Sequence, residues 1–258
     1  MQNNSEKILS SPINTHCCVQ RNALFNCLDA PQRDALSSII YHSRIVHKGD
    51  LLFRQGDPFY RVYLIGSGSF KSSISDESGN LHITAFNFSS NILGFDGLCS
   101  GVHIYDVEAL ETASVCSIAF DLLEEILGQD LGRFYRQLIS KVYKDDFCNN
   151  RSSMIFCRMR SEQRLARFFL GLSKSMGNRG CSILDFPLTM TRSDLASYLG
   201  ITPETLSRVF RRFQDERLIG VVGHRVLILN IEGLRAVEAG EHDFFELRSQ
   251  MSMLKKTA

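Results

Sequence analysis

The stretch TRSDLASYLGITPETLSRVFRRFQDERL, residues 191–218, decides how the fold of this chain is interpreted. Its first part, TRSDLASYLG, predicts a short helix in which Thr191 or Ser193 caps the first turn. Gly200 follows this helix, and a glycine there supplies the positive φ that a tight turn requires. We therefore expect one short helix that ends in a sharp turn.

The second part of the stretch predicts a longer helix. Thr202 is a suitable N-cap, and Pro203 takes the first helical position, where its missing N–H is no loss. Spacings of three and four residues give this helix one apolar stripe, made of Leu206, Val209, Phe210 and Phe213. Two short helices joined by a glycine turn predict a helix-turn-helix, whose second helix enters the major groove of DNA.

The polar side of the second helix carries groups that suit base edges and phosphates. Arg208 can donate two hydrogen bonds to guanine, Glu204 can accept one from cytosine, and Ser207 can do either. Arg211 and Arg212 lie about one turn further along, where phosphates are the expected partners. The alternative is a helical hairpin whose basic face is incidental.

The segment LIGVVGHRVLILN, residues 218–230, alternates apolar and polar side chains about Gly223. It predicts a β-hairpin wing with His224 and Arg225 at its tip. Between Arg158 and Arg235 there are 13 Lys and Arg against 7 Asp and Glu, whereas the whole chain has a net charge of +1. Such a basic segment favours a polyanion partner, although chance can produce the same asymmetry. The candidate DNA-binding residues are Glu204, Ser207, Arg208, Arg211, Arg212, Thr202, Thr191 and Arg225.

Residues 42–128 alternate short strand-like runs with turn signals. The runs are LLFRQ, RVYLI, SFKSSIS, LHITAFN and VEALETASVCSIAF, and the breaks contain KGD, QGDP, GSGS and ESGN. Regular short strands separated by Gly, Asp and Asn predict an antiparallel sandwich or barrel.

Helical spacing begins after Asp121. Two adjacent apolar stripes form a broad face there, Phe134, Leu138 and Val142 on one and Tyr135, Ile139 and Tyr143 on the other. The face can form a dimer seam, or it can belong to two core helices with a connector. A further helix, SEQRLARFFLGLSKSMG, is expected to begin with Ser161 as its cap.

The composition is that of a globular protein, with 44% hydrophobic and 22% charged residues. No apolar run approaches the roughly 18 residues that cross a bilayer, and the first segment, MQNNSEKILSSPINTH, lacks the apolar region of a secretory signal. We therefore expect a cytoplasmic protein without a membrane partner. Gly-rich phosphate loops and nucleophile elbows are missing from the sequence, which disfavours an enzyme. A DNA-independent interaction module is a remote alternative.

Over roughly residues 15–235, the chain resembles the Crp/Fnr transcription regulators. The motif LTMTRSDLASYLGITPETLSR, GFDGL at Gly94–Leu98 and ALETASVCSIAF at Ala109–Phe120 look like the FNR branch. The resemblance implies an α+β fold with an N-terminal antiparallel β-roll of the cyclic-nucleotide-binding type, a long dimerisation helix and a C-terminal winged helix-turn-helix. It also implies a homodimer on palindromic double-stranded DNA with TTGAT-like half-sites, read by an E-x-x-S-R pattern at Glu204, Ser207 and Arg208.

The same resemblance divides the chain into a cysteine segment (1–29), a β-roll sensor domain (30–128), a dimerisation helix (129–160), the winged helix-turn-helix (161–235) and a tail (236–258). Asp145 and Asp146 would then face their dimer mates, and like charges at a seam oppose association. A signal that moves this helix can switch dimerisation. The loop at Asp76–Asn80 resembles the surface by which activators of the family touch RNA polymerase.

Oxygen-sensing members of the family hold a four-iron, four-sulfur (4Fe-4S) cluster on four cysteines. By resemblance, Cys116 matches the ligand in the roll, and Cys18 and Cys27 match the outer pair of the N-terminal motif. Arg21 occupies the middle position and cannot bind iron, because a guanidinium has no lone pair to offer. Cys17 can supply a fourth thiolate, although neighbouring side chains in an extended chain point to opposite faces.

The alternative to a cluster is a constitutive or thiol-redox regulator on the same DNA site. We expect the remaining thiols, Cys99, Cys148, Cys157 and Cys181, to be packing residues. The cyclic-AMP members of the family carry an Arg-Ser pair that holds the cyclic phosphate. The segment GFDGLCSGVHIYDVEAL offers no such pair, so we expect no cyclic nucleotide.

Overall fold

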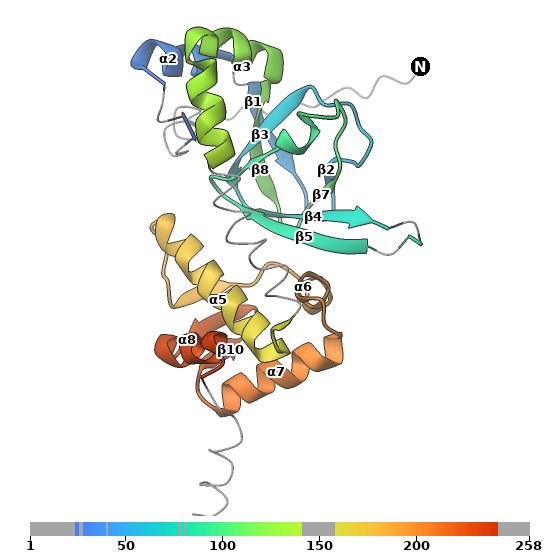
Figure 1. Cartoon of the computed structure of the whole chain (residues 1–258), viewed down its shortest axis with the longest axis vertical. Coiled ribbons are helices and arrows are strands. Elements are labelled where there is room, and N and C mark those ends of the chain that lie inside the picture. The colour runs from blue at the N-terminus through green and yellow to red at the C-terminus, as the bar shows by residue number, and fades with distance from the viewer. Residues whose placement is uncertain are drawn as a thin grey trace, which may run out of the picture. The chain divides into compact units, whose positions relative to one another are not determined.

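The computed structural model describes residues 24–25, 28–39, 41–76, 78–79, 81–140 and 158–241. The chain divides into two compact units, Met1–Cys148 and Asn149–Ala258. Figure 1 labels most of their elements. The division falls within the segment expected to form a dimerisation helix.

The first unit is built on two antiparallel sheets. Their strands are β1 (Tyr41–Val46), β2 (Leu51–Phe53), β3 (Arg61–Ser67), β4 (Ser69–Ser75), β5 (Leu81–Phe88), β6 (Ile92–Leu93), β7 (Asp106–Ala109) and β8 (Ala113–Ala119). One sheet has the order β1-β8-β3-β6 and the other β2-β7-β4-β5, with every adjacent pair antiparallel. The predicted antiparallel β-roll is confirmed.

Only Gly68 separates β3 from β4, so the chain passes from one sheet to the other at this residue. Gly68 has a φ of +83°, and a Cβ placed on it would lie 2.6 Å from the Cβ of Ala113 on β8. Both the backbone angle and the close approach therefore require glycine here.

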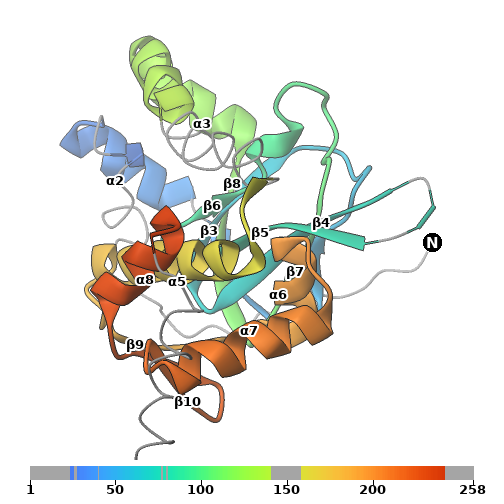
Figure 2. The same ribbon diagram turned by 60° about the horizontal axis from the view of Figure 1, so that its bottom comes forward.

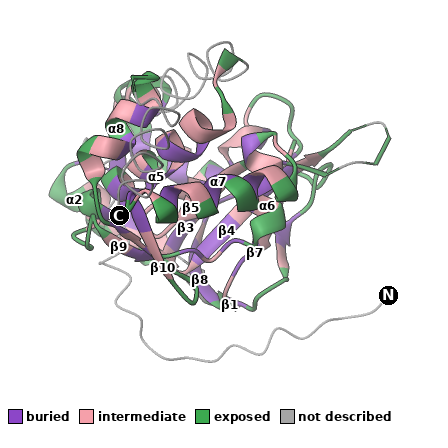
Figure 3. Cartoon of the chain, turned by 90° about the horizontal axis from the view of Figure 1, so that it is seen from below, coloured by how far each residue is buried: buried purple, intermediate pink, exposed green. Residues whose placement is uncertain are grey.

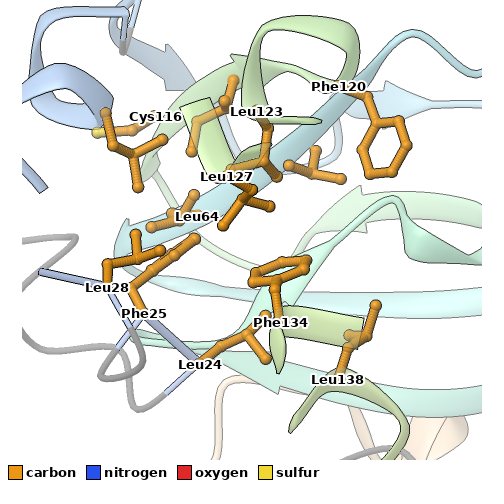
Figure 4. Packing of buried hydrophobic residues seen from close by; sticks show 13 residues of the cluster. Leu24, Phe25, Leu28, Leu64, Cys116, Phe120, Leu123, Leu127, Phe134 and Leu138 are labelled. Carbon is orange, nitrogen blue, oxygen red and sulfur yellow. The ribbon is translucent and has the colours of Figure 1, made fainter. Parts of the chain in front are cut away.

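An apolar core lies between these sheets and another lies under helices. The first includes Val46, Phe53, Ile65, Phe70, Val107 and Val115. The second joins α2 (Ala30–Ile39), α3 (Phe120–Leu127) and the helical residues 131–140 to strands β3 and β8. Figure 4 shows side chains of this second core, among them Leu64, Cys116, Leu123 and Phe134. The cores fix the sheets and helices of the unit as one body.

The two predicted apolar stripes differ in burial along the helical residues 131–140. Phe134 and Leu138 are buried in their own unit, whereas Ile139 is 63% exposed. The hydroxyl of Tyr135 donates to Oε1 of Glu124 at 2.6 Å, and burial together with the charge and hydrogen bond of Glu124 raises the pKa of Tyr135 to about 12. The continuation of both stripes at Val142 and Tyr143, with Asp145 and Asp146, lies outside the described residues.

The second unit contains α5 (Ser161–Asn178), β9 (Asp185–Pro187), α6 (Arg192–Leu199), α7 (Pro203–Asp215), β10 (Ile219–Val222), β11 (Arg225–Ile228) and α8 (Ile231–Ala239). Helix α7 packs against α5, α6 and β10, all labelled in Figure 2. The predicted helix-turn-helix and its β10–β11 wing are confirmed. Strand β9 was not predicted from the sequence, and it pairs with β11 to complete a three-stranded sheet.

Helix α5 begins one residue away from the predicted cap arrangement. Its N-cap is Arg160, whose backbone N–H donates to Oε1 of Gln163 at 2.9 Å, so the prediction of a Ser161 cap is wrong. A glutamine three residues after the cap can return a bond to the cap backbone whatever the cap side chain is. Within the described residues, no helix is both long enough and apolar enough to cross a membrane.

Candidate nucleic-acid interface

Helix α6 starts and ends as its sequence predicts. The Thr191 hydroxyl accepts from the N–H of Asp194 at 3.0 Å, and the Asp194 carboxylate accepts from the N–H of Thr191 at 3.1 Å. This reciprocal box selects Thr191 over Ser193 as the cap. At the other end, Gly200 adopts a φ of +62° and turns the chain toward α7.

Helix α7 is fixed by its cap and its apolar stripe. The Thr202 hydroxyl accepts from the N–H of Thr205 at 3.2 Å, and Pro203 follows at the first helical position. The buried residues of α7 are Leu206, Val209, Phe210 and Phe213, the stripe that the sequence predicts. Because this stripe is held in the core, the opposite side of α7 must face outward.

That outward side carries most of the predicted base-reading set. Glu204, Ser207, Arg208 and Arg211 are all exposed, and their spacings of three and four residues put them on one face. Figure 3 shows exposed and buried segments side by side along α7. This face therefore carries a carboxylate, guanidinium groups and a hydroxyl. Together they can accept hydrogen bonds from, and donate them to, the edges of neighbouring base pairs.

Each base-reading side chain already has a local partner. The Ser207 hydroxyl donates to the carbonyl of Pro203 at 2.9 Å, which leaves its oxygen free to accept. Arg208 donates from Nη2 to Oγ1 of Thr205 at 3.0 Å. The backbone N–H of Glu204 and the Thr202 hydroxyl, with a smaller contribution from Arg208, hold the pKa of Glu204 below its usual range. The carboxylate is therefore ionised at neutral pH.

Two arginines of the predicted set are engaged within the unit. Nη1 of Arg212 lies 2.6 Å from Oε1 of Glu162 on α5, and neither side chain is fully exposed. Arg225 donates from Nε to Oδ1 of Asp185 on β9 at 2.9 Å, which raises the pKa of Arg225. Both arginines therefore tie elements of the unit together. That these two arginines contact phosphate stays a prediction. To do so, each arginine must either leave its carboxylate or bind the carboxylate and the phosphate together.

One residue that sequence reasoning missed is Arg164 on α5. Its Nη1 donates to the carbonyls of Leu199 and Gly200, at 2.9 and 3.2 Å, and its Nε donates to the carbonyl of Met159 at 3.1 Å. The first two carbonyls lie at the end of α6, where a helix leaves acceptors without intrahelical partners. The sequence indicates that this helix end needs a hydrogen-bond donor. It does not indicate which residue supplies that donor.

A second missed contact joins α6 to α7. The guanidinium of Arg192 lies 3.5 Å from the centre of the Phe210 ring. Such a stacked cation contributes roughly 0.5–1 kcal/mol at exposed sites. The contact therefore adds to the packing that sets the angle between the two helices.

The candidate cluster ligands lie in the first unit, and only one is among the described residues. Cys116 on β8 is 1% exposed in the core that also contains Leu24, Phe25 and Leu28 (Figure 4). Cys17, Cys18 and Cys27, like Arg21, lie outside the described residues. In the part of the chain that the structure describes, no group of three or more His, Cys, Asp or Glu is placed to hold a metal.

The other cysteines do not behave as the sequence suggests. Cys99 and Cys181 are exposed, so their prediction as packing residues is wrong. Cys99 lies in the turn after GFDGL, and Cys181 lies just beyond the end of α5, positions that leave the thiols outside the cores. Cys148 and Cys157 lie outside the described residues.

The segment after GFDGL is closed by a buried polar pair. Nδ1 of His103 lies 3.2 Å from Oδ1 of Asp96, and Oδ2 of Asp96 accepts from the N–H of Ile104 at 2.8 Å. The imidazole also stacks on Phe53, with ring centres 3.8 Å apart. Asp96 therefore ties its own short helix, Phe95–Gly97, to the chain that follows it.

Comparisons with known proteins agree with both units. The model of the Crp-like helix-turn-helix domain matches residues 163–237, and that of the cyclic nucleotide-binding domain matches residues 43–130. Electron transport regulator A of Shewanella oneidensis is 36% identical over 203 residues, which cover 79% of this chain and 81% of that protein. The fumarate and nitrate reduction regulatory protein of Salmonella typhimurium is 35% identical over 223 residues, 86% of this chain and 88% of that protein.

Among solved structures, FixK2 from Bradyrhizobium japonicum has a TM-score of 0.65 at 23% identity, covering 76% of this chain and 96% of that one. A β-roll followed by a winged helix-turn-helix defines the class, a transcription regulator with a DNA-binding domain. The chain belongs to the Crp/Fnr family, and within it to the FNR and Anr-like regulators. These relatives are regulators rather than enzymes.

Proposed function

We propose that this protein binds palindromic double-stranded DNA with TTGAT-like half-sites as a homodimer. It controls genes of anaerobic or redox-dependent metabolism, as the names of its relatives suggest. The observation that carries the proposal is the exposed face of α7, where Glu204, Ser207 and Arg208 stand opposite a buried stripe. A helix presented in this way is the element that the major groove admits.

Each residue of the face has a defined task in this proposal. Arg208 donates to the O6 and N7 atoms of guanine, and ionised Glu204 accepts from N4 of cytosine. Ser207 accepts through the oxygen that its bond to Pro203 leaves free. Thr191 and Thr202 begin α6 and α7, whose N-terminal backbone N–H groups and positive dipole ends suit phosphates. Arg211 is the exposed cation of α7 best suited to a phosphate.

The remaining partners follow from the same family. RNA polymerase is proposed to contact the loop at 76–80, in which Oδ1 of Asp76 accepts from the N–H of Ser78 at 2.9 Å. Homodimerisation is assigned to the segment 129–160, whose Ile139 is exposed. The switch at Asp145 and Asp146 stays a prediction on residues outside those described.

A gel-shift titration tests DNA recognition. A duplex with two TTGAT-like half-sites should bind much more tightly than one with scrambled half-sites, and binding should weaken steeply with salt as counterions are released. Arg208→Ala should cost about 1–3 kcal/mol and relax the choice at one base pair. Equal binding of both duplexes by the parent protein would contradict the proposal.

For the sensor, we propose that thiolates of Cys17, Cys18, Cys27 and Cys116 hold a 4Fe-4S cluster. When bound, such a cluster supplies an oxygen-labile centre. The proposal is supported by Leu24, Phe25 and Leu28, because residues on both sides of Cys27 in the sequence are buried in the core that contains Cys116. The donor set fits only if Cys17 replaces the ligand that Arg21 cannot provide.

Anaerobic reconstitution with iron and sulfide tests this site. The parent should gain visible absorption and bound iron, and Cys116→Ser and Cys17→Ser should each prevent the gain. Cys99→Ser is a matched control, because this exposed thiol lies outside the proposed set. If the parent protein takes up no iron, the cluster proposal is wrong and a thiol-redox or constitutive mechanism takes its place. The result of the gel-shift titration does not depend on this outcome.

A further inference from the structure

We infer that Gln32 is a positioning residue that links the segment containing Cys27 to the start of the helix proposed to form the dimer seam. This inference rests on the proposed homodimer and on the assignment of residues 129–160 to dimerisation. It holds whether Cys27 binds a cluster or its thiol senses redox state directly. Its basis is a hydrogen bond between two residues that are 98 positions apart, Gln32 and Asp130.

The side-chain amide of Gln32 uses both of its ends. Its Oε1 accepts from the N–H of Asp29 at 3.0 Å, and Oδ1 of Asp29 accepts from the N–H of Gln32 at 2.8 Å. These reciprocal bonds form a capping box at the start of α2. The other end of the amide, Nε2, donates to Oδ2 of Asp130 at 2.9 Å. One side chain therefore joins the start of α2 to Asp130.

Asp130 lies where the helical residues 131–140 begin. It is the last residue of the short helix Gly128–Asp130, and Leu131 follows it directly. Phe134, in the first turn of the helical residues, is buried in the core of the unit, whereas Ile139 near their end is exposed. A helix moves as a stiff element, so a shift at Asp130 is carried along it toward the proposed seam.

Apolar packing brings the two segments together but does not fix their register. Leu24, Phe25 and Leu28 lie in one core with Phe134, and the rings of Phe25 and Phe134 stack with centres 6.1 Å apart (Figure 4). Apolar contacts are non-directional, so they tolerate small sliding movements. The bond from Gln32 to a carboxylate is directional and charge-assisted. This bond therefore sets where α2 sits on the start of the helix.

The link connects the neighbours of Cys27 to the proposed dimer seam. In the sequence, Cys27 lies between Phe25 and Leu28, which are both buried in the shared core. A change that moves these neighbours must either move Asp130 as well or break its bond to Gln32. By thermodynamic linkage the effect is reciprocal, so formation of the dimer changes how readily the segment around Cys27 opens.

Gln32→Glu tests the link, because glutamate still accepts at the start of α2 but can no longer donate to Asp130. It also brings two carboxylates together, which opposes the contact. Adding Asp130→Asn to this variant reverses the bond, since an amide at residue 130 can donate to the carboxylate at residue 32. The double variant also keeps the net charge of the parent pair. Asp130→Asn alone is the matched control, because the Gln32 amide still has an oxygen to bond.

The first measurement is the rate at which iodoacetamide alkylates Cys27 in the reduced, metal-free full chain, with the exposed Cys99 as internal reference. Peptide mass spectrometry separates the two thiols. Gln32→Glu should raise the ratio of the Cys27 rate to the Cys99 rate about fivefold, the factor of one net hydrogen bond, because the segment opens more often. The added negative charge by itself would disfavour the reactive thiolate, so a rise reports opening. The double variant should return to the parent ratio, and Asp130→Asn alone should stay close to it.

The second measurement repeats this ratio on a duplex with one TTGAT-like half-site and on a palindromic duplex with two. The chain is thereby compared as a monomer and as a dimer, with sedimentation to confirm the stoichiometry. In the parent the ratio should differ between the two duplexes. In Gln32→Glu this difference should be lost, and the double variant should restore it. A residue with a merely structural role would alter the rate without removing its dependence on dimerisation.

Three results would overturn the inference. Gln32→Glu can leave the Cys27 ratio unchanged, the parent ratio can be the same on both duplexes, or the ratio in Gln32→Glu can follow dimerisation as it does in the parent. Failure of the proposed function is a different outcome, because sedimentation would then show that the parent itself forms no dimer on the palindromic duplex.

Discussion

Arg164 of α5 donates a hydrogen bond to the carbonyl oxygen of Leu199, the last residue of α6, at 2.9 Å. The same nitrogen also reaches the carbonyl of Gly200 at 3.2 Å. One guanidinium thus satisfies the acceptors at the turn between the two DNA-binding helices. Because the donor is charged and the end of a helix dipole is negative, the contact is favourable beyond an ordinary hydrogen bond.

Arg164→Ala should therefore lower the free energy of unfolding by about 2–3 kcal/mol, because several carbonyls lose a charged donor. Chemical denaturation of the full chain measures the loss. Arg167→Ala is the control one turn away, where the ion pair with Glu238 at 3.6 Å is partly exposed and its removal should cost about 1 kcal/mol or less. Equal losses in the two variants would show that Arg164 does not hold the turn.

The adjacent arginines Arg211 and Arg212 should differ in what they do. Arg211 is exposed, so Arg211→Ala should weaken binding to all duplexes alike and reduce the salt slope by about one unit. Arg212 is paired with Glu162, so Arg212→Ala should lower stability by about 1 kcal/mol. Titrations at several salt concentrations, with denaturation curves of the same proteins, separate the two effects. If Arg212→Ala reduces the salt slope and Arg211→Ala lowers stability, then Arg212, and not Arg211, contacts the phosphate.

The helix-turn-helix could be predicted from the sequence because its determinants are local. The Thr191 box, the Gly200 turn and the Thr202 cap each connect residues at most three positions apart or need one special φ. The apolar stripe on α7 follows from helical periodicity alone. The β-roll was predictable for a similar reason, since glycine turns such as Gly68 separate its short strands.

The unpredicted features depend on partners distant in the sequence. Arg212 meets Glu162 and Arg225 meets Asp185 across 50 and 40 positions, so periodicity places each arginine on a polar side without revealing its partner. Strand β9 exists because β11 offers it an edge, which no local pattern announces. The exposure of Cys99 likewise depends on where a loop lies and not on residue type.

Tyr135 predicts a pH-dependent contribution to stability. Its pKa is raised in the folded protein from 10.0 to about 12, so its contribution is fully present below pH 10 and is lost as the pH rises toward 12. Tyr135→Phe removes the 2.6 Å bond to Glu124 and should cost about 1 kcal/mol at pH 8. The difference between parent and variant should shrink above pH 10, because the tyrosine ionises in the unfolded chain while it stays protonated in the folded protein until about pH 12. A constant difference across this range would contradict the assignment.

Replacing Gly68 by alanine should be an especially destabilising small substitution in the β-roll. Gly68→Ala must adopt a φ of +83° and bring a Cβ within 2.6 Å of the Ala113 Cβ, so the free energy of unfolding should fall by about 2–4 kcal/mol. Gly101→Ala has a φ of +74° but open space around the new Cβ, so only the backbone cost of about 1–2 kcal/mol applies. Denaturation curves of the two variants separate strain from overlap. If the two losses are equal, β8 has moved away, and the close approach of the sheets at Gly68 is not required for folding.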